Sequence, residues 1–312
     1  MTPQKSAVDW FGFRTQSEVL DGLQALRGLY GDPGSWLKLR HLDHGKDGFR
    51  QAASIHLDDM AVGRVDFGGV SQRGWARWNI TGKGCEWVKD WDAVQDLEAL
   101  SSAQVKRVDI ALTTWEGEVS HETVSAAHAS GQFCLGGRPP DMRFITSSNP
   151  RAGRTCEVGN RKADKFLRGY EKGFELLSKL PEADANQTTH IDGFLVEGIY
   201  RTEVEFKAKT RPISWDVVER RDEYFAGAYP FCATLLAGVE PGRFPRGPER
   251  APQEDLQAAL ANLKNQWGSV LFTALVASRG DISAVWSQIV GDRHNEALLE
   301  AGVLLVDHPW LV

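Results

Sequence analysis

Carboxylate side chains recur at alternate positions in two segments of this 312-residue chain. In RVDIAL, residues 107–112, Asp109 lies between apolar residues, and in YRTEVEF, residues 200–206, Glu203 and Glu205 flank Val204. Because alternate residues of a β-strand share a face, each strand keeps its carboxylates together. Carboxylate oxygens are hard ligands that suit Mg²⁺ or Mn²⁺. The spacing therefore predicts a divalent-metal site, provided that both strands belong to one sheet whose apolar face is covered by helices.

The same alternation is also typical of a solvated strand face, on which Glu203 and Glu205 would pair with Arg107 or Arg201. Spacing alone favours these ion pairs, because acidic residues on strands are common. Other catalytic sites find less support, since the eight histidines form no HxH or HExxH pair and the chain has no GxSxG elbow and no phosphate-binding loop of the GxxxxGK[ST] type. The carboxylates remain the strongest candidates for chemistry, with both interpretations open.

One tyrosine, Tyr170, stands in the charged segment KFLRGYEKGFE, residues 165–175. Residues 138–172 hold nine Arg or Lys against four Asp or Glu, although the formal net charge of the chain is −6. Such a local basic patch suits a polyanion, because phosphate contacts supply much of the affinity for nucleic acids. A solvated loop with internal ion pairs explains the charges equally well. By itself, Tyr170 is most simply a half-buried aromatic residue that closes a hairpin.

The elements that must position these residues follow from apolar periodicity and turn signals. Strands are expected at 7–15, 49–57, 61–70, 74–80, 105–115, 154–159, 165–170 and 198–209, and helices at 17–31, 85–102, 121–131, 214–227, 252–278, 281–291 and 295–302. This order predicts an α+β fold with a mainly antiparallel sheet and flanking helices, followed by a helical C-terminal region. We expect a main domain over 1–235, a Pro/Gly-rich linker over 236–252 and helices over 253–312.

Composition indicates the cellular compartment in which we expect the protein. The four cysteines are far apart and form no CxxC pair, which favours a reducing cytosol over a disulfide framework or a zinc ribbon. The N-terminal residues lack the pattern of an export signal, and no apolar run approaches the roughly 18 residues of a membrane span. We expect a soluble cytoplasmic protein without membrane contact. Among the eleven tryptophans, Trp75, Trp78 and Trp87 could stack on the bases of single-stranded DNA, although most of the eleven are expected in the core.

Three segments in this order resemble the replication initiation factor family, the Rep-trans type of rolling-circle initiators from small plasmids and filamentous phages. They are RVDIALTTWEGEVS, GRTCEVGNRKADKFLRGYEKGFE and YRTEVEFKAKTRPISWDVVERRDEYFAGAYP. The likeness runs from AVDWFGF to about residue 235 and is greatest to the phage or prophage branch. It implies a site-specific nicking and closing enzyme: a tyrosine attacks an origin phosphodiester with help from a carboxylate-bound divalent metal, Mg²⁺ or Mn²⁺. The products are a 5′-phosphotyrosine link and a free 3′-OH primer.

Carried onto this sequence, the resemblance makes Tyr170 the nucleophile and Asp109 and Glu203 metal ligands. The chain departs from the family at two positions. Thr113 stands where members often have a second Asp, and Glu157 stands where they often have a tyrosine. We therefore expect metal ligation by Asp109, Glu203, Glu205 and Glu157, catalytic assistance to the tyrosine from Lys172 and Arg168, and phosphate contacts from Arg154, Arg161, Lys162 and Lys165.

The resemblance also implies partners: double-stranded and single-stranded origin DNA, a host helicase, a single-strand-binding protein and a second copy of the chain, in the cytoplasm of a bacterial host. Two other functions stay open. A relative whose catalytic residues have decayed would bind origin DNA without cutting it, for which Thr113 is the motivating observation. A metal-dependent nuclease would cut without a covalent intermediate and would leave Tyr170 a structural role.

Overall fold

The computed structural model describes residues 4–244 and 256–294. The chain forms two compact units, Met1–Pro245 and Arg246–Val312. All of the residues expected to do chemistry lie in the first unit.

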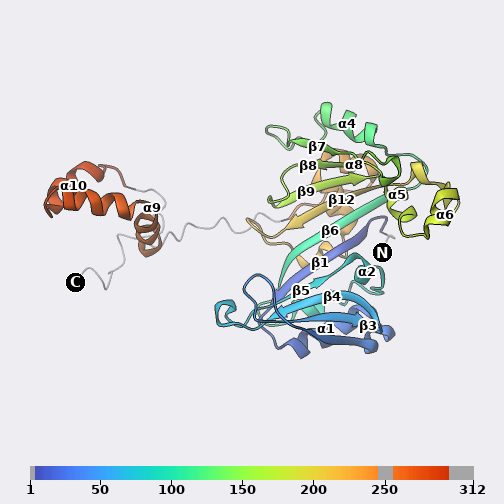
Figure 1. The fold of residues 1–312 in the computed structure, drawn as a ribbon, viewed down its shortest axis with the longest axis horizontal. Helices are drawn as coiled ribbons and strands as arrows, with labels where there is room; N and C mark the ends of the chain where they lie inside the picture. The colour runs from blue at the N-terminus through green and yellow to red at the C-terminus, as the bar shows by residue number, and fades with distance from the viewer. Residues whose placement is uncertain (1–3, 245–255, 295–312) are drawn as a thin grey trace. The chain divides into compact units, whose positions relative to one another are not determined.

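A ten-stranded sheet forms the centre of the first unit (Figure 1). Its strand order is β2-β3-β4-β5-β1-β6-β12-β9-β8-β7, and every neighbouring pair is antiparallel. The strands are β1 (Ala7–Thr15), β2 (Leu37–Leu42), β3 (Gln51–Leu57), β4 (Met60–Phe67), β5 (Ala76–Ile80), β6 (Gln104–Thr114), β7 (Met142–Ile145), β8 (Thr155–Val158), β9 (Lys165–Tyr170) and β12 (Tyr200–Lys207). A separate hairpin pairs β10 (His190–Ile191) with β11 (Phe194–Leu195). The predicted α+β fold with an antiparallel sheet is confirmed.

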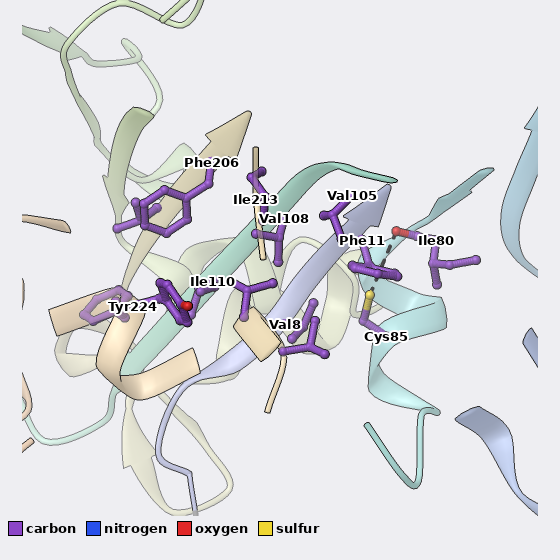
Figure 2. Packing of buried hydrophobic residues seen from close by; sticks show 14 of the residues in the cluster. Val8, Phe11, Ile80, Cys85, Val105, Val108, Ile110, Phe206, Ile213 and Tyr224 are labelled. Atoms are coloured by element: carbon purple, nitrogen blue, oxygen red, sulfur yellow. Dashed lines mark hydrogen bonds between the residues drawn. The ribbon is translucent and has the colours of Figure 1, made fainter. Parts of the chain in front are cut away.

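Eight α-helices accompany the sheet in the described part of the first unit. They are α1 (Val19–Tyr30), α2 (Gly82–Glu86), α3 (Val94–Glu98), α4 (His121–Ala129), α5 (Lys172–Leu177), α6 (Glu182–Gln187), α7 (Arg221–Ala228) and α8 (Pro230–Leu235). Several of them, α1 among them, contribute to the core on the apolar face of the sheet. Leu26 and Leu29 of α1 are fully buried in the same core as Phe11 and Phe13 of β1. Figure 2 shows the centre of this core, where Val108 and Ile110 of β6 lie beside strand β1. The core therefore takes the apolar side of each strand and leaves the polar side on the opposite face.

One predicted helix is interrupted. Residues 85–102 were expected to form a single helix, but α2 ends at Glu86 and α3 begins at Val94. Between them the carboxylate of Asp90 accepts a hydrogen bond from the backbone N–H of Asp92 at 2.9 Å. Such local side-chain bonds compete with helical backbone bonds, which explains why the apolar periodicity misled us here.

In the second unit, α9 (Leu256–Ala277) and α10 (Ile282–Ile289) confirm the predicted helices, while the helix expected at 295–302 lies outside the described residues. The first half of the expected linker, 236–244, packs on the first unit instead: Leu236 is fully buried, and the ring of Phe244 stacks on that of Tyr224 at 4.5 Å. The remainder, 245–252, lies outside the described residues. No helix in the described ranges is long and apolar enough to cross a membrane.

Candidate active site

The polar face of the sheet brings most of the predicted site residues together. Residues that oppose each other on neighbouring antiparallel strands share a face. Asp109 of β6 lies opposite Glu205 of β12, and Glu203 of β12 lies opposite Arg168 of β9. Tyr170 lies opposite Arg201. Asp109 and Glu203 are thus on the same side of the sheet, as the alternation predicted.

Asp109 and Glu205 share one cation. The Nη2 of Arg107 lies 2.5 Å from Asp109 Oδ2 and 2.7 Å from Glu205 Oε2, and the ammonium of Lys207 contacts the other oxygen of Glu205. Both carboxylates are buried. Burial raises the pKa of Asp109 to about 7; Arg107 opposes this rise, and the nearby carboxylates Glu203 and Glu205 add to it. The pair thus concentrates negative charge at a position where one cation can contact both groups.

Glu203 and Glu157 are held differently. Glu203 accepts a hydrogen bond from Arg168 Nη2 at 2.8 Å, and Glu157 pairs with Arg143 and with Arg161, the latter at 3.3 Å. Glu157 stands on β8, three strands from β6, which is about 14 Å at the usual strand spacing. It is therefore too far from Asp109 to be its fourth co-ligand, and this part of our prediction is wrong.

The predicted four-carboxylate metal shell is not assembled. Within the described residues, no group of three or more His, Cys, Asp or Glu side chains could hold a metal ion. Asp109 and Glu205 nevertheless fit a hard divalent cation, because Arg107 already bridges them and Mg²⁺ commonly takes only one or two carboxylates. Spacing alone had favoured ion pairs of Glu203 and Glu205 with Arg107 or Arg201. The structure confirms such a pair between Glu205 and Arg107. Glu203 instead pairs with Arg168.

Tyr170 ends strand β9 and lines a pocket of about 370 Å³. Arg154, Arg161 and Arg168 line the same pocket. The residue before it, Gly169, faces the other side of the sheet, where a Cβ atom would come within 2.7 Å of the Tyr200 hydroxyl oxygen. Glycine is needed there because the Tyr200 ring packs directly against the strand. This close packing fixes the end of β9 and hence the place of Tyr170.

The electrostatic setting of Tyr170 differs from our expectation. Its ring lies 5.0 Å from the Arg168 guanidinium and 5.7 Å from the Lys172 ammonium. Arg168 is paired with Glu203, and Lys172 is paired with Glu175 at 2.8 Å. Burial raises the pKa of the Tyr170 phenol well above its ordinary value; Arg201 is the cation that opposes the rise. In this state the cations beside the phenol do not outweigh the effect of its burial on the pKa, contrary to the assistance that we expected from Lys172 and Arg168.

Arg201 is a site residue whose role the sequence did not indicate. Its Nη1 donates to Asp9 Oδ1 at 2.8 Å and its Nε donates to Thr113 Oγ1 at 2.9 Å. Asp9 reaches this face because the register of β1 against β6 shifts between Val8 and Trp10. Alternation in YRTEVEF correctly placed Arg201 on the same face as Glu203. Asp9 was missed because the register shift that brings it to this face has no reliable signal in the sequence. Thr113, which departs from the family pattern, holds Arg201 in place.

The four residues expected to contact phosphate divide into two pairs. Arg154 donates to Glu171 and to Glu122, at 2.8 and 2.6 Å, so its charge is already neutralised. Lys165 lies on the apolar side of the sheet, where its ammonium donates to the Ala228 carbonyl and lies 3.9 Å from the Tyr229 ring centre. Neither fits the predicted role. Arg161 and Lys162 lie at the surface, as a phosphate contact requires.

The remaining tyrosines are structural, as the sequence indicated for three of them. Tyr30, Tyr200, Tyr224 and Tyr229 are between 0% and 5% exposed. All five tyrosines of the chain lie in the described residues, and Tyr170 is the only one that is not buried. A large substrate can therefore reach one tyrosine of this chain without unfolding it.

Comparison with known proteins matches a family model and solved structures. Residues 103–261, about half of the chain, match the family model described as replication initiation factor. Among solved structures, the fold is similar to that of a rolling circle replication initiator protein from Geobacillus stearothermophilus, with a TM-score of 0.53 and 17% sequence identity over 78% of this chain and 99% of that chain. No curated protein matches. At this identity the structural likeness is one of fold, while the matched range contains Asp109, Tyr170 and Glu203.

Proposed function

The chain belongs to the replication initiation factor family, and from this premise we propose that it initiates rolling-circle replication by nicking one strand of origin DNA with Tyr170. The observation that carries this proposal is the exposure of Tyr170 on the carboxylate-bearing face, when every other tyrosine is buried. Its pocket of about 370 Å³ is open to solvent, and three arginines and three glutamates line it: Arg154, Arg161, Arg168, Glu157, Glu171 and Glu175. Arg161 is the best placed of these to meet a phosphate, since its side chain is 60% exposed.

In the proposed step, the Tyr170 oxygen forms a bond to phosphorus and the bond from phosphorus to the 3′ oxygen breaks. The phenol gives up its proton, and the leaving 3′ oxygen takes one up. One phosphodiester is thus exchanged for another, so the tyrosyl link keeps the energy needed for later rejoining. The site supplies positioning and positive charge, which are the main protein contributions to phosphoryl transfer.

A divalent metal is the proposed cofactor, with Asp109 and Glu205 as its protein ligands. When bound, such an ion would stabilise negative charge on the phosphate and the departing oxygen. Arg107 occupies the space between the two carboxylates and must turn aside for the ion to bind. Glu203 stands beside this pair on β12 and keeps Arg168 next to the tyrosine ring.

The experiment incubates the protein with a random single-stranded DNA library and Mn²⁺, and recovers covalent adducts under denaturing conditions for sequencing. We expect one enriched cleavage sequence for the wild type and no adduct for Tyr170→Phe. Tyr229→Phe is the matched control, because it removes a hydroxyl from a buried tyrosine and should still form the adduct. Adducts on the Tyr170→Phe variant would show that another group is the nucleophile.

The same incubation separates the two alternatives when a denaturing gel records cleavage and a parallel sample, recovered under native conditions, records binding. Cleavage with no adduct would assign the chain to metal-dependent nucleases and Tyr170 to structure. Enrichment of a bound sequence without cleavage would assign it to origin-binding proteins, for which the Thr113 departure was the motivating observation.

The metal proposal has a test that does not depend on cleavage. Calorimetric titration with Mn²⁺ should show one site in the wild type and a loss of affinity of tenfold or more in Asp109→Asn and Glu205→Gln, the order of effect expected when a protein ligand is removed. Glu157→Gln is the control, since β8 lies three strands from Asp109. Unchanged binding in both Asp109→Asn and Glu205→Gln would place the metal elsewhere.

A further inference from the structure

Arginine side chains on the polar face of the sheet repeatedly lie against aromatic rings. At the site itself, Arg168 lies 5.0 Å from the ring centre of Tyr170. Two strands away, the guanidinium of Arg107 lies 4.9 Å from the ring centre of Trp10. Each of these arginines is also ion-paired with a carboxylate of the site.

The pattern continues beyond the site. Arg14 of β1 lies 4.0 Å from the ring centre of Trp75, and Arg77 of β5 lies 5.1 Å from that of Phe49. Arg14 and Arg77 oppose each other across the β1–β5 pair, so they share a face. Both rings are half-exposed and within reach of a ligand.

The register of the strands places the arginines of these four arginine–aromatic pairs on one face of the sheet. Arg107 opposes Gly12 of β1 on one side and Lys207 of β12 on the other, which places it on the face that carries Arg14. From β9 to β5 the sheet passes through β12, β6 and β1, four strand spacings or about 19 Å. Along the strands, Tyr170 lies level with Thr113 of β6 and Arg14 lies level with Gln104, nine residues or about 30 Å away, so the path is a diagonal of about 35 Å. At the stacked rise of 3.4 Å per nucleotide, this distance corresponds to about ten nucleotides of one strand.

Gly12 has no side chain, so no atom rises above strand β1 in the middle of this path. A Cβ atom at Gly12 would lie 3.0 Å from Asn79 Oδ1 and 3.6 Å from the indole nitrogen of Trp10. Without that atom, the Trp10 ring lies close over the strand and faces Arg107.

Of the four arginines, Arg14 is the one whose charge is best able to meet a phosphate. Among the described residues it forms no ion pair, and its Nε and Nη2 donate to the neutral Gln104 side chain at 3.1 and 2.8 Å. Arg77, by comparison, is paired with Asp47 and with Asp66. Alternating aromatic faces and cations match single-stranded DNA, whose unpaired bases can stack and whose phosphates carry charge. A duplex keeps its bases stacked inside and could use only the charges.

We propose that this face, from Tyr170 diagonally across β12, β6 and β1 to Trp75 and Arg14, is a track that binds about ten nucleotides of single-stranded DNA beside the nick. The proposal rests on the proposed function, since it names the strand that the same site cuts. It assigns to Arg14 and Trp75 a role far from the basic segment 138–172.

The test measures binding of fluorescent oligonucleotides by the full chain in the Tyr170→Phe background, so that cleavage does not interfere. Trp75→Leu and Arg14→Gln should each weaken single-strand affinity on the order of 10- to 100-fold, as loss of one stacked base does, and should change duplex affinity less. Arg14→Gln should also reduce the salt slope by about 0.7. The matched control replaces Trp87 and Lys89, a cation–aromatic pair beside Leu29 of α1, by Leu and Gln. It should change affinity less than twofold.

A second measurement guards against misfolded variants. Oligonucleotides carrying 5-iodouracil at successive positions should crosslink to the peptide containing Trp75 when the iodouracil lies about ten nucleotides from the cleavage position, on one side only. Unaltered affinity in both variants, or no crosslink at Trp75 from either side, would overturn the track. Absence of any tyrosyl adduct in the wild type would instead overturn the nicking proposal, while loss of single-strand binding in Trp75→Leu would still support the track.

Discussion

At the scale of single residues, Arg201 offers the clearest test of how Tyr170 is positioned. Its guanidinium bonds Asp9 and Thr113 at once and is the cation that lowers the pKa of the neighbouring phenol. We expect Arg201→Gln to slow nicking about tenfold or more at neutral pH, the factor that corresponds to one pKa unit of the phenol. Arg201→Lys keeps the charge but cannot make both bonds, so it should recover part of the rate. Equal rates for all three proteins, measured under single-turnover conditions, would remove Arg201 from the site.

Lys165 gives a prediction for stability against pH. Burial lowers its pKa from 10.5 to about 8 in the folded chain, so the folded state holds the proton less readily than the unfolded state. Between pH 8 and 10.5 only the unfolded state keeps the proton, and the free energy of unfolding should rise with pH by up to about 3 kcal/mol. Lys165→Met should abolish this rise, as measured by urea unfolding at pH 7.5, 9 and 10.5. The same slope in both proteins would show that Lys165 is solvated.

The positions of some of these residues could be predicted from the sequence, whereas those of others could not. Lys165 and Tyr170 are five positions apart, so strand alternation alone puts them on opposite faces, and the charge count obscured this. Arg154 is different. Its neutralisation depends on Glu122 from α4 and Glu171 after β9, which are distant in sequence and meet only when the fold is complete. Partners across 17 or 32 positions cannot be read from local spacing.

At the scale of elements, the packing of β9 on β12 places the tyrosine. A Cβ atom at Gly169 would meet the Tyr200 hydroxyl at 2.7 Å, so Gly169→Ala should destabilise the fold by about 1–3 kcal/mol, as overpacking of a core does. Tyr200→Phe removes the nearest atom and should recover part of the loss in the double variant. Urea unfolding of the four proteins gives the coupling free energy. Strictly additive effects would mean that the strand moves away instead of meeting the ring.

Elements were predicted well where one period persisted. The alternation in 105–115 and 198–209 gave β6 and β12 and placed Asp109 and Glu203 on one face. The order of strands was beyond reach, because β6 lies between β1 and β12, and these pairings join segments about 100 residues apart. That order decided the site: it brought Glu205 opposite Asp109 and left Glu157 three strands away. It also placed Arg14 on the same face of the sheet as Asp109, which no local pattern indicated.

At the scale of the whole molecule, the site and its core lie in one unit. The core that includes Phe11, Val108 and Leu236 is built from residues between Val8 and Phe244, all of them in the first unit. A chain ending at Pro245 should therefore melt within about 2 °C of the full chain, a shift that corresponds to less than 1 kcal/mol for a domain of this size. It should also form the tyrosyl adduct at an unchanged single-turnover rate. Calorimetry and the adduct assay check the two statements separately. A stable truncated chain that no longer forms the adduct would mean that the helices α9 and α10 act in the chemistry, and a truncated chain that fails to fold would mean that the two units stabilise each other.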